Sequence, residues 1–293
     1  MPREPDALLD PRTHAYRDDL ADAKLQGQVS AARFVSGKAH SLTAHRTPIR
    51  SAPHPEAGQT SEALFGEALW VFEIKDGWAW AQLSRDGYVG YVEASALGEP
   101  GGKDNQAFRI SAPRALIFAA PDLKSAVRGW LPMAARIEVQ ERSGPYVQLA
   151  SGGWTHENWI ASADTEFPDF VATADRFAQA PYGWGGCTVA GLDCSGLVQL
   201  ALIMAGYACP RDSDQQAASL GDLVAAGAPF MRGDLVFFPG HVGLMVDDTH
   251  LLHANATHMA VTVNPLRDVE EIVRRSDSQG RGITARKRLS AVQ

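Results

Sequence analysis

The stretch that decides the fold of this chain is a glycine-rich loop that runs directly into an apolar helix. It reads Tyr182-Gly183-Trp184-Gly185-Gly186 and continues, a few residues later, as Leu192-Asp193-Cys194-Ser195-Gly196-Leu197-Val198-Gln199-Leu200. Glycines adopt backbone dihedrals that other residues resist, so the chain can pass close to other atoms before the helix begins. Apolar residues lie nearly all round the predicted helix, which indicates that it is buried and ends near Gly206.

One cysteine stands where the loop meets the helix. Cys194 falls in the predicted first turn, and Asp193 before it is a plausible N-cap. Unpaired backbone N–H groups and the helix dipole favour an anion at this place, so we expect a nucleophilic thiolate. The alternative is a buried structural cysteine, which would need neither the glycine loop nor the cap.

Two histidines can serve such a thiol. His241 follows a Pro-Gly turn and opens a predicted strand, and His253 lies 12 positions further on the next strand. In a hairpin the two side chains can face the same side, so that one acts on Cys194 while the other holds its tautomer. A surface histidine is the alternative for each. We expect no metal and no cofactor, because the two histidines have no third ligand and the three cysteines have no C-x-x-C spacing.

Length and composition describe an ordinary globular chain. It has 293 residues, 45% of them hydrophobic and 21% charged, with a net charge of −7. The length predicts two or three domains, and the negative charge argues against nucleic acid and against an anionic membrane as partners. The N-terminus has no cationic start with an apolar run behind it, so we expect no signal peptide. An odd, small number of cysteines (Cys187, Cys194 and Cys209) fits a reducing compartment, and we expect a cytoplasmic protein.

The region before the glycine loop consists of short β-rich runs separated by turns. Runs bounded by Asp-Gly turns occupy 69–73, 78–83 and 88–92, and a similar pattern returns at 135–140, 146–149, 153–155 and 159–160. Gly77 and Gly144 are 67 positions apart, and Gly87 and Gly153 are 66 apart, which indicates a duplicated β unit. Residues 98–106 read as the linker between the copies. A short amphipathic helix is expected between Arg17 and Phe34.

The region around and after the loop alternates between helix and strand patterns. We expect a helix over 169–179, a short helix reaching Leu223, and strands over 233–238, 241–246 and 251–254. The charged tail from Asp268 is interpreted as a last strand or a solvated end.

These segments resemble the NlpC-type, papain-like cell-wall cysteine peptidases, and the β units in front resemble tandem bacterial SH3-like domains. The resemblance is carried by the glycine loop, the Cys194 helix and three further segments, Pro210-Arg211-Asp212-Ser213-x-x-Gln216, Gly233-Asp234-Leu235-Val236-Phe237-Phe238 and Gly240-His241-Val242-Gly243. It implies an α+β fold, with the cysteine helix packed on an antiparallel sheet behind two small barrels. The implied organisation is an N-terminal extension (1–39), SH3-like domains (40–98 and 106–164) and a peptidase domain (165–293).

The resemblance also implies residue roles. Cys194 is the nucleophile, His241 the base and His253 its orienting residue, while Tyr182 helps the Cys194 N–H to stabilise the oxyanion. Asp193, Ser195, Asp212 and Ser213 line the substrate groove. Glu67 and Tyr88 of the first SH3-like domain join Asp193 around the substrate's ammonium. Cys187 departs from the small polar residue expected inside the loop.

The expected function follows from these roles. The chain resembles endopeptidases that cleave the bond between γ-D-glutamate and a diamino acid (diaminopimelate or lysine) in murein peptides with a free N-terminal L-alanine. The expected partner is that peptide, and the protein is expected to be a monomer. Two alternatives stay open: an amidase or acyltransferase of the same fold with a non-murein substrate, and a non-catalytic cell-wall-binding protein.

Overall fold

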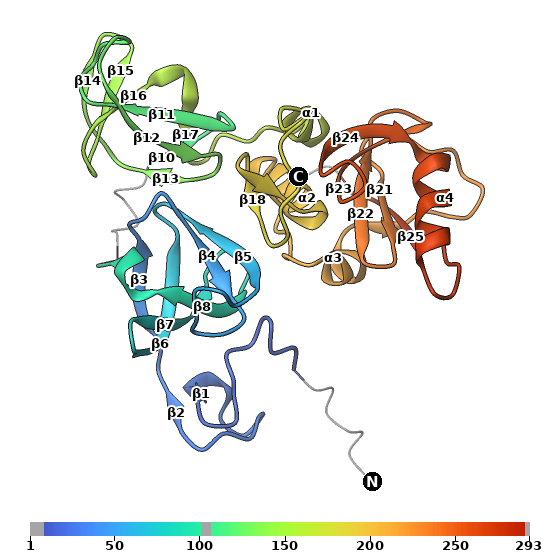
Figure 1. Cartoon of the computed structure of the whole chain (residues 1–293), viewed down its shortest axis with the longest axis horizontal. Coiled ribbons are helices and arrows are strands. Elements are labelled where there is room, and N and C mark those ends of the chain that lie inside the picture. Colours follow the sequence, from blue (N-terminus) through green and yellow to red (C-terminus); the bar gives the residue numbers. More distant parts are fainter. Residues whose placement is uncertain (1–8, 101–106, 291–293) are drawn as a thin grey trace. The chain divides into compact units, whose positions relative to one another are not determined.

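The computed structural model describes residues 9–100 and 107–290 (Figure 1). The chain divides into two compact units, Met1–Asn105 and Gln106–Gln293, and each is described by itself. Of the predicted linker 98–106, residues 101–106 lie outside the described part.

The first unit begins with an irregular segment where the sequence predicted a helix between Arg17 and Phe34. That prediction was wrong: β1 (Ala21–Asp22) pairs in parallel with β2 (Phe34–Val35), and only a single 3-10 turn, Ala23–Leu25, lies between them. The Asp22 side chain accepts from the backbone N–H of Lys24, and Gly27 has a φ of 82°. A local side-chain cap and a left-handed residue after one turn end the helix before it can propagate.

An SH3-like barrel follows in the first unit, and its strands confirm the predicted hairpins. The hairpin of β6 (Ala68–Lys75) and β7 (Trp78–Leu83) turns at Asp76 and Gly77, whose φ angles are 50° and 81°. Positive φ at both turn residues is the type I′ geometry that Asp-Gly favours. The seven-stranded sheet has the order β5-β4-β8-β7-β6-β3-β9. Its other strands are β3 (Lys38–Leu42), β4 (Arg46–Arg50), β5 (Gln59–Leu64), β8 (Val89–Glu93) and β9 (Leu97–Gly98).

The second unit opens with a barrel that repeats this order of elements. The hairpin of β14 (Val139–Ser143) and β15 (Tyr146–Leu149) corresponds to β6 and β7. In both barrels the strand after the hairpin leads through a 3-10 turn, Ala94–Ala96 or Glu157–Trp159, into a closing strand. The remaining strands are β10 (Phe108–Ile110), β11 (Arg114–Phe118), β12 (Val127–Pro132), β13 (Arg136–Ile137), β16 (Trp154–His156) and β17 (Ile160–Ser162).

The rest of the second unit is an α+β domain built on a six-stranded antiparallel sheet of order β20-β25-β21-β22-β23-β24. The sheet strands are β20 (Asp222–Leu223), β21 (Leu235–Phe238), β22 (His241–Met245), β23 (His250–Asn255), β24 (Ala260–Pro265) and β25 (Ala285–Arg288). A small hairpin of β18 (Cys187–Thr188) and β19 (Gly191–Leu192) precedes the helix α2 (Cys194–Met204). Two short helices, α1 (Phe170–Asp175) and α3 (Ser213–Ser219), flank it.

The sheet separates two hydrophobic clusters. Val242, Leu244 and Leu252 pack with α2 on one face, whereas Met245 and Leu251 pack with α4 (Leu266–Ser276) on the other (Figure 1). The tail from Asp268 contains the predicted last strand, β25, and also most of helix α4, which the sequence analysis did not predict. The buried apolar residues Leu266 and Val269 of α4 recur at helical spacing, so a single face suffices to hold a mainly charged helix on the sheet.

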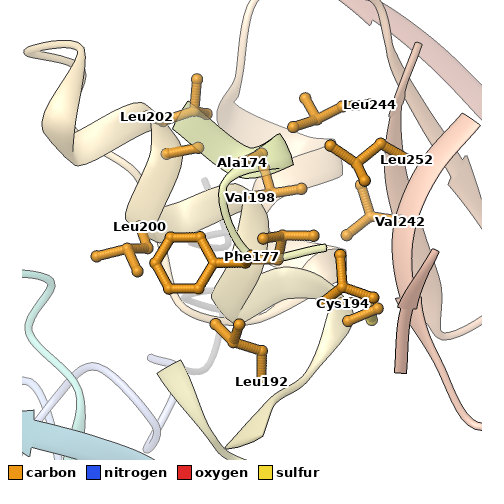
Figure 2. Close-up of a cluster of buried hydrophobic side chains, with 14 of the residues drawn as sticks. Ala174, Phe177, Leu192, Cys194, Val198, Leu200, Leu202, Val242, Leu244 and Leu252 are labelled. Atoms are coloured by element: carbon orange, nitrogen blue, oxygen red, sulfur yellow. The ribbon is translucent and has the colours of Figure 1, made fainter. Parts of the chain in front are cut away.

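Helix α2 is buried nearly all round, as predicted. Of its eleven residues only Ile203 is not buried, and the core around it includes Phe177, Leu192 and the sheet residues named above (Figure 2). At its far end Gly206 has a φ of 90°, and Arg109 of the second barrel donates to the carbonyl oxygens of Ile203 (3.4 Å) and Met204 (3.1 Å). These carbonyls have no partner inside the helix, so the barrel stabilises the end opposite Cys194.

Candidate active site

Asp193 and two glycines fix the start of the helix that carries Cys194. One carboxylate oxygen of Asp193 accepts from the N–H of Gly196 (2.7 Å) and the other from the N–H of Gly185 (2.8 Å). A Cβ at Gly196 would lie 2.3 Å from the carbonyl oxygen of Gly186, so only glycine allows this close approach. The cap predicted for Asp193 is therefore confirmed, and it connects the glycine loop to the first helical turn.

Arg211 is buried against Asp193, and the sequence reasoning gave it no role. Its guanidinium, 1% exposed, donates to both oxygens of Asp193 (2.9 and 2.7 Å) and to Ser195 Oγ (2.9 Å). Burial alone would lower the pKa of Arg211, but the carboxylate beside it raises that pKa above its usual range. A lone arginine in the Pro210-Arg211-Asp212 segment gives no local signal of this pairing, because its partner lies 18 positions away.

The surroundings of the Cys194 thiol favour its protonated form. Cys194 is 7% exposed, and burial together with the negative charge of Asp193 raises the pKa of its thiol to about 12. The backbone N–H groups of Val242 and Ser195 act in the opposite direction and do not compensate. Loss of water outweighs the helix N-terminus here, so a thiolate requires a base at the moment of reaction.

His241, the predicted base, directly precedes Val242 in the chain. His241 is the first residue of β22 and His253 lies inside β23, and the 2.8 Å between His241 Nε2 and His253 Nδ1 is one hydrogen bond between the two rings. Burial lowers the pKa of His241 to about 3, helped by His253, and burial also lowers that of His253 to about 4. Both rings are therefore neutral at physiological pH and can accept a proton.

A chain of polar side chains continues beyond His253 and was missed by sequence reasoning. His253 Nε2 lies 3.1 Å from Asn264 Oδ1, and the Thr262 hydroxyl donates to that same oxygen. Asn255 Nδ2 in turn donates to Thr262 Oγ1 (2.8 Å). The available signal was the alternation of Thr262 and Asn264 along a strand, which places both on one face beside His253.

Tyr182 lies close to the candidate nucleophile. It is partly buried and packs against the core that contains Cys194. Burial raises the pKa of its phenol to about 12, and the neighbouring Cys194 and Asp193 contribute, so the hydroxyl stays a hydrogen-bond donor. Two positions along, Trp184 is 71% exposed on the same loop.

The other predicted groove residues lie around the same helix start. Ser195 is buried and its hydroxyl donates to Asp193 (3.3 Å) while accepting from Arg211. Asp212 occupies the N-cap position of α3, and Ser213 is the first residue of that helix. Ser195 directly follows Cys194 in α2, and Asp212 directly follows Arg211, which pairs with Asp193. Contact of these residues with substrate stays a prediction.

Glu67 and Tyr88 belong to the first unit, and both are buried in its barrel. The Glu67 carboxylate pairs with Arg85 and accepts from the N–H of Leu64 (2.8 Å). Burial raises the pKa of Glu67 although Arg85 opposes the shift. Tyr88 is 5% exposed. Their predicted role toward a substrate ammonium stays a prediction.

A cavity of about 470 Å³ adjoins the histidine pair. His241, His253 and Asn264 form one wall, and residues of α4, including Asp268 and Ile272, form another. Within the described residues no group of three or more histidine, cysteine or acidic side chains is arranged to hold a metal ion. None of the described helices is long and apolar enough to cross a membrane.

Two segments of the chain match known families. Residues 179–272 match the NlpC/P60 family, and residues 49–97 match the bacterial dipeptidyl-peptidase Sh3 domain. The structure is similar to the crystal structure of an NlpC/P60 family protein from Bacillus cereus, with a TM-score of 0.70 and 18% identity over 86% of this chain and 99% of that one. This likeness shows a shared fold.

Two curated relatives carry more specific names. Dipeptidyl-peptidase 6 of Lysinibacillus sphaericus is 32% identical over 146 residues, which are 44% of this chain and 51% of that protein. The gamma-D-glutamyl-L-lysine dipeptidyl-peptidase of Bacillus cereus is 25% identical over 239 residues, 70% of each chain. The match thus spans about half of the first relative and 70% of the second.

Proposed function

We propose that this chain, which carries an NlpC/P60 domain behind a bacterial dipeptidyl-peptidase Sh3 domain, is a cysteine peptidase that cleaves murein peptides between γ-D-glutamate and a diamino acid. The observation that carries the proposal is the 2.8 Å hydrogen bond between His241 and His253, beside a cysteine in the first turn of a buried helix. A nucleophile, a base and an orienting residue are the groups that acyl transfer through cysteine requires. The name of the Bacillus cereus relative, gamma-D-glutamyl-L-lysine dipeptidyl-peptidase, supports the substrate class.

The reaction begins with transfer of the Cys194 proton to His241. Because Nε2 of His241 is engaged by His253, Nδ1 is the nitrogen that accepts this proton. The sulfur attacks the γ-carbonyl carbon of D-glutamate, and the tetrahedral oxyanion is held by the Cys194 N–H and the Tyr182 hydroxyl. The carbon–nitrogen bond then breaks, and the protonated His241 gives its proton to the departing amine.

Hydrolysis of the acyl-enzyme reverses the proton transfers. Water gives one proton to His241 and its oxygen attacks the thioester carbon. Collapse releases the γ-D-glutamyl carboxylic acid, and the sulfur regains a proton from His241. The cavity beside His241 and His253 has room for the departing diamino acid, whose amine must lie next to His241 when it receives its proton.

Recognition of a free N-terminal L-alanine is part of the same proposal. Asp193 is proposed to meet its ammonium, and the roles of Glu67 and Tyr88 of the first unit stay predictions from the resemblance. Asp193 already pairs with Arg211, so an ammonium would share carboxylate oxygens that are held in place. Acceptors held in this way bind a positively charged ammonium at the right position more tightly than a neutral, acetylated nitrogen.

Product analysis by mass spectrometry tests the proposal. Peptides L-Ala-γ-D-Glu-diaminopimelate and L-Ala-γ-D-Glu-L-Lys, each with a free or acetylated N-terminus, are incubated with the enzyme. We expect release of L-Ala-γ-D-Glu from the free peptides only, loss of this activity in Cys194→Ala, and its retention in Cys209→Ser, where another buried cysteine of the same core is changed. Equal cleavage of acetylated peptides would favour a non-murein amidase, and no cleavage would favour a wall-binding protein.

A cytoplasmic location and a monomeric state complete the proposal. Cys187, Cys194 and Cys209 are buried and form no disulfide, which suits a reducing compartment. The net charge of −7 gives no attraction to nucleic acid or anionic lipid. Cell fractionation tests the location, and light scattering on a sizing column tests the expected mass of 31.5 kDa.

A further inference from the structure

We propose that Asn255, Thr262 and Asn264 are positioning residues that fix which ring nitrogen of His253, and through it of His241, carries a proton. The proposal rests on the proposed function, because it assigns His241 as the base for Cys194. His241 can accept that proton only at a nitrogen without hydrogen. Its Nε2 faces His253, so Nε2 must carry the hydrogen and Nδ1 must be bare.

The direction of the hydrogen bonds is set by a backbone group. The N–H of His258 lies 2.9 Å from Asn255 Oδ1, and a backbone N–H can only donate. This contact identifies the Asn255 oxygen, and the ring nitrogen Nδ1 of His258 lies 3.0 Å from the same atom. The other terminal atom of Asn255 is therefore the amide nitrogen, which donates to Thr262 Oγ1 at 2.8 Å.

The donor and acceptor roles at Asn255 also fix those between Thr262 and Asn264. Its hydroxyl oxygen accepts from Asn255, so its single hydrogen points to the Asn264 side-chain oxygen, 2.6 Å away. That oxygen lies 3.1 Å from His253 Nε2 and has no hydrogen to give, so the ring must donate. Asn255 Nδ2 also lies 3.4 Å from His253 Nε2, but one of its two hydrogens goes to Thr262 Oγ1 at 2.8 Å and the other has the Ala260 carbonyl oxygen at 3.3 Å.

The two rings then have a single consistent arrangement. A hydrogen on His253 Nε2 leaves Nδ1 with a lone pair, which accepts from His241 Nε2 across 2.8 Å. His241 Nδ1 is left bare for the Cys194 proton. If the Asn264 amide turned over, its NH₂ would meet His253 Nε2, both rings would adopt the other tautomer, and His241 could no longer act as base. His253 and Asn255 are only 4% and 6% exposed, so both side chains are held inside the domain.

Removing the Thr262 hydroxyl tests the assignment. Thr262→Val keeps the shape of the side chain but frees the Asn264 amide to turn. We expect kcat on L-Ala-γ-D-Glu-L-Lys to fall by about 10- to 100-fold, the effect seen when a metal-binding histidine loses the residue that orients its ring. Thr262→Ser, which keeps the hydroxyl, should recover most of the activity. Val263→Thr is the matched control, because Val263 is 43% exposed and alternates to the opposite face of the strand.

A second substitution separates a directional role from a structural one. Asn264→Asp offers two oxygens and no NH₂, so either orientation accepts from His253 Nε2. The double variant Thr262→Val with Asn264→Asp should therefore recover the tautomer and much of the kcat that Thr262→Val alone loses. A purely structural role for Thr262 predicts no such recovery.

Nitrogen-15 NMR of the enzyme without substrate determines the tautomers of His241 and His253. We expect the Nε2–H form for both His241 and His253 in the wild type and in Thr262→Ser, and a mixture in Thr262→Val. An Nδ1–H form of wild-type His253, or Thr262→Val with unchanged tautomers and unchanged kcat, would overturn the proposal. Failure of the proposed function would look different: the wild type would show the expected tautomers and cleave none of the γ-glutamyl peptides.

Discussion

Removing the guanidinium of Arg211 isolates a carboxylate at the N-terminus of the helix that carries Cys194. Arg211→Met takes away the hydrogen bonds of 2.9 and 2.7 Å to Asp193 and the one to Ser195, in a site where the two charged side chains are 1% and 9% exposed. Loss of one partner from a buried ion pair costs about 3–5 kcal/mol, since the remaining charge stays out of water. The N–H groups of Gly185 and Gly196 compensate only in part.

Hydrogen exchange of the α2 amides measures this cost locally, which suits a chain with several domains. At about 1.4 kcal/mol per tenfold change, a loss of 3–5 kcal/mol accelerates exchange by about two to four orders of magnitude. The double variant Asp193→Asn with Arg211→Met leaves no lone charge, and asparagine still caps a helix. We expect it to exchange at least about tenfold more slowly than Arg211→Met. Equal exchange in both variants, or no acceleration in Arg211→Met, would refute the account of the buried pair.

Three further predictions concern the same site. Because His241 and His253 have pKa values of about 3 and 4 when folded and near 6.5 when unfolded, the unfolded chain binds more protons below about pH 6.5. The free energy of unfolding should therefore fall as pH falls below about 6.5, with a limiting slope of about 1.4 kcal/mol per pH unit for each ring. The melting temperature should depend less on pH in a variant in which both His241 and His253 are replaced by asparagine. Gly196→Ala should lower the melting temperature, because its Cβ would lie 2.3 Å from the Gly186 carbonyl oxygen, and an unchanged melting curve would contradict the tight loop. Tyr182→Phe should lower kcat by about 100-fold with little change in KM if its hydroxyl holds the oxyanion, whereas a change in KM alone would assign it to ground-state binding.

The parts that local sequence encodes were predictable. The cap by Asp193, the buried helix after it and the strands that carry His241 and His253 follow from residues within a few positions of each other. Close backbone approach at Gly186 also follows, since glycine is the residue type that permits it. These features need no knowledge of distant partners.

The parts that depend on distant contacts were not predictable. The pair of Arg211 with Asp193 and the chain through Thr262 and Asn264 exist only after strands and loops come together. The raised thiol pKa has the same origin, because burial of Cys194 is a property of the folded core and not of the helix end. Helix α4 was not predicted for another reason: most of its residues are charged, and its apolar face is narrow.

The central claim is that Cys194 forms an acyl-enzyme with the γ-glutamyl part of the substrate, and acid quenching during turnover tests it most directly. Enzyme quenched with L-Ala-γ-D-Glu-L-Lys present is digested and its peptides are mapped by mass spectrometry. The account predicts an L-Ala-γ-D-Glu group on the peptide that contains Cys194. An acyl group on another residue, or full hydrolysis by Cys194→Ala, would contradict the account.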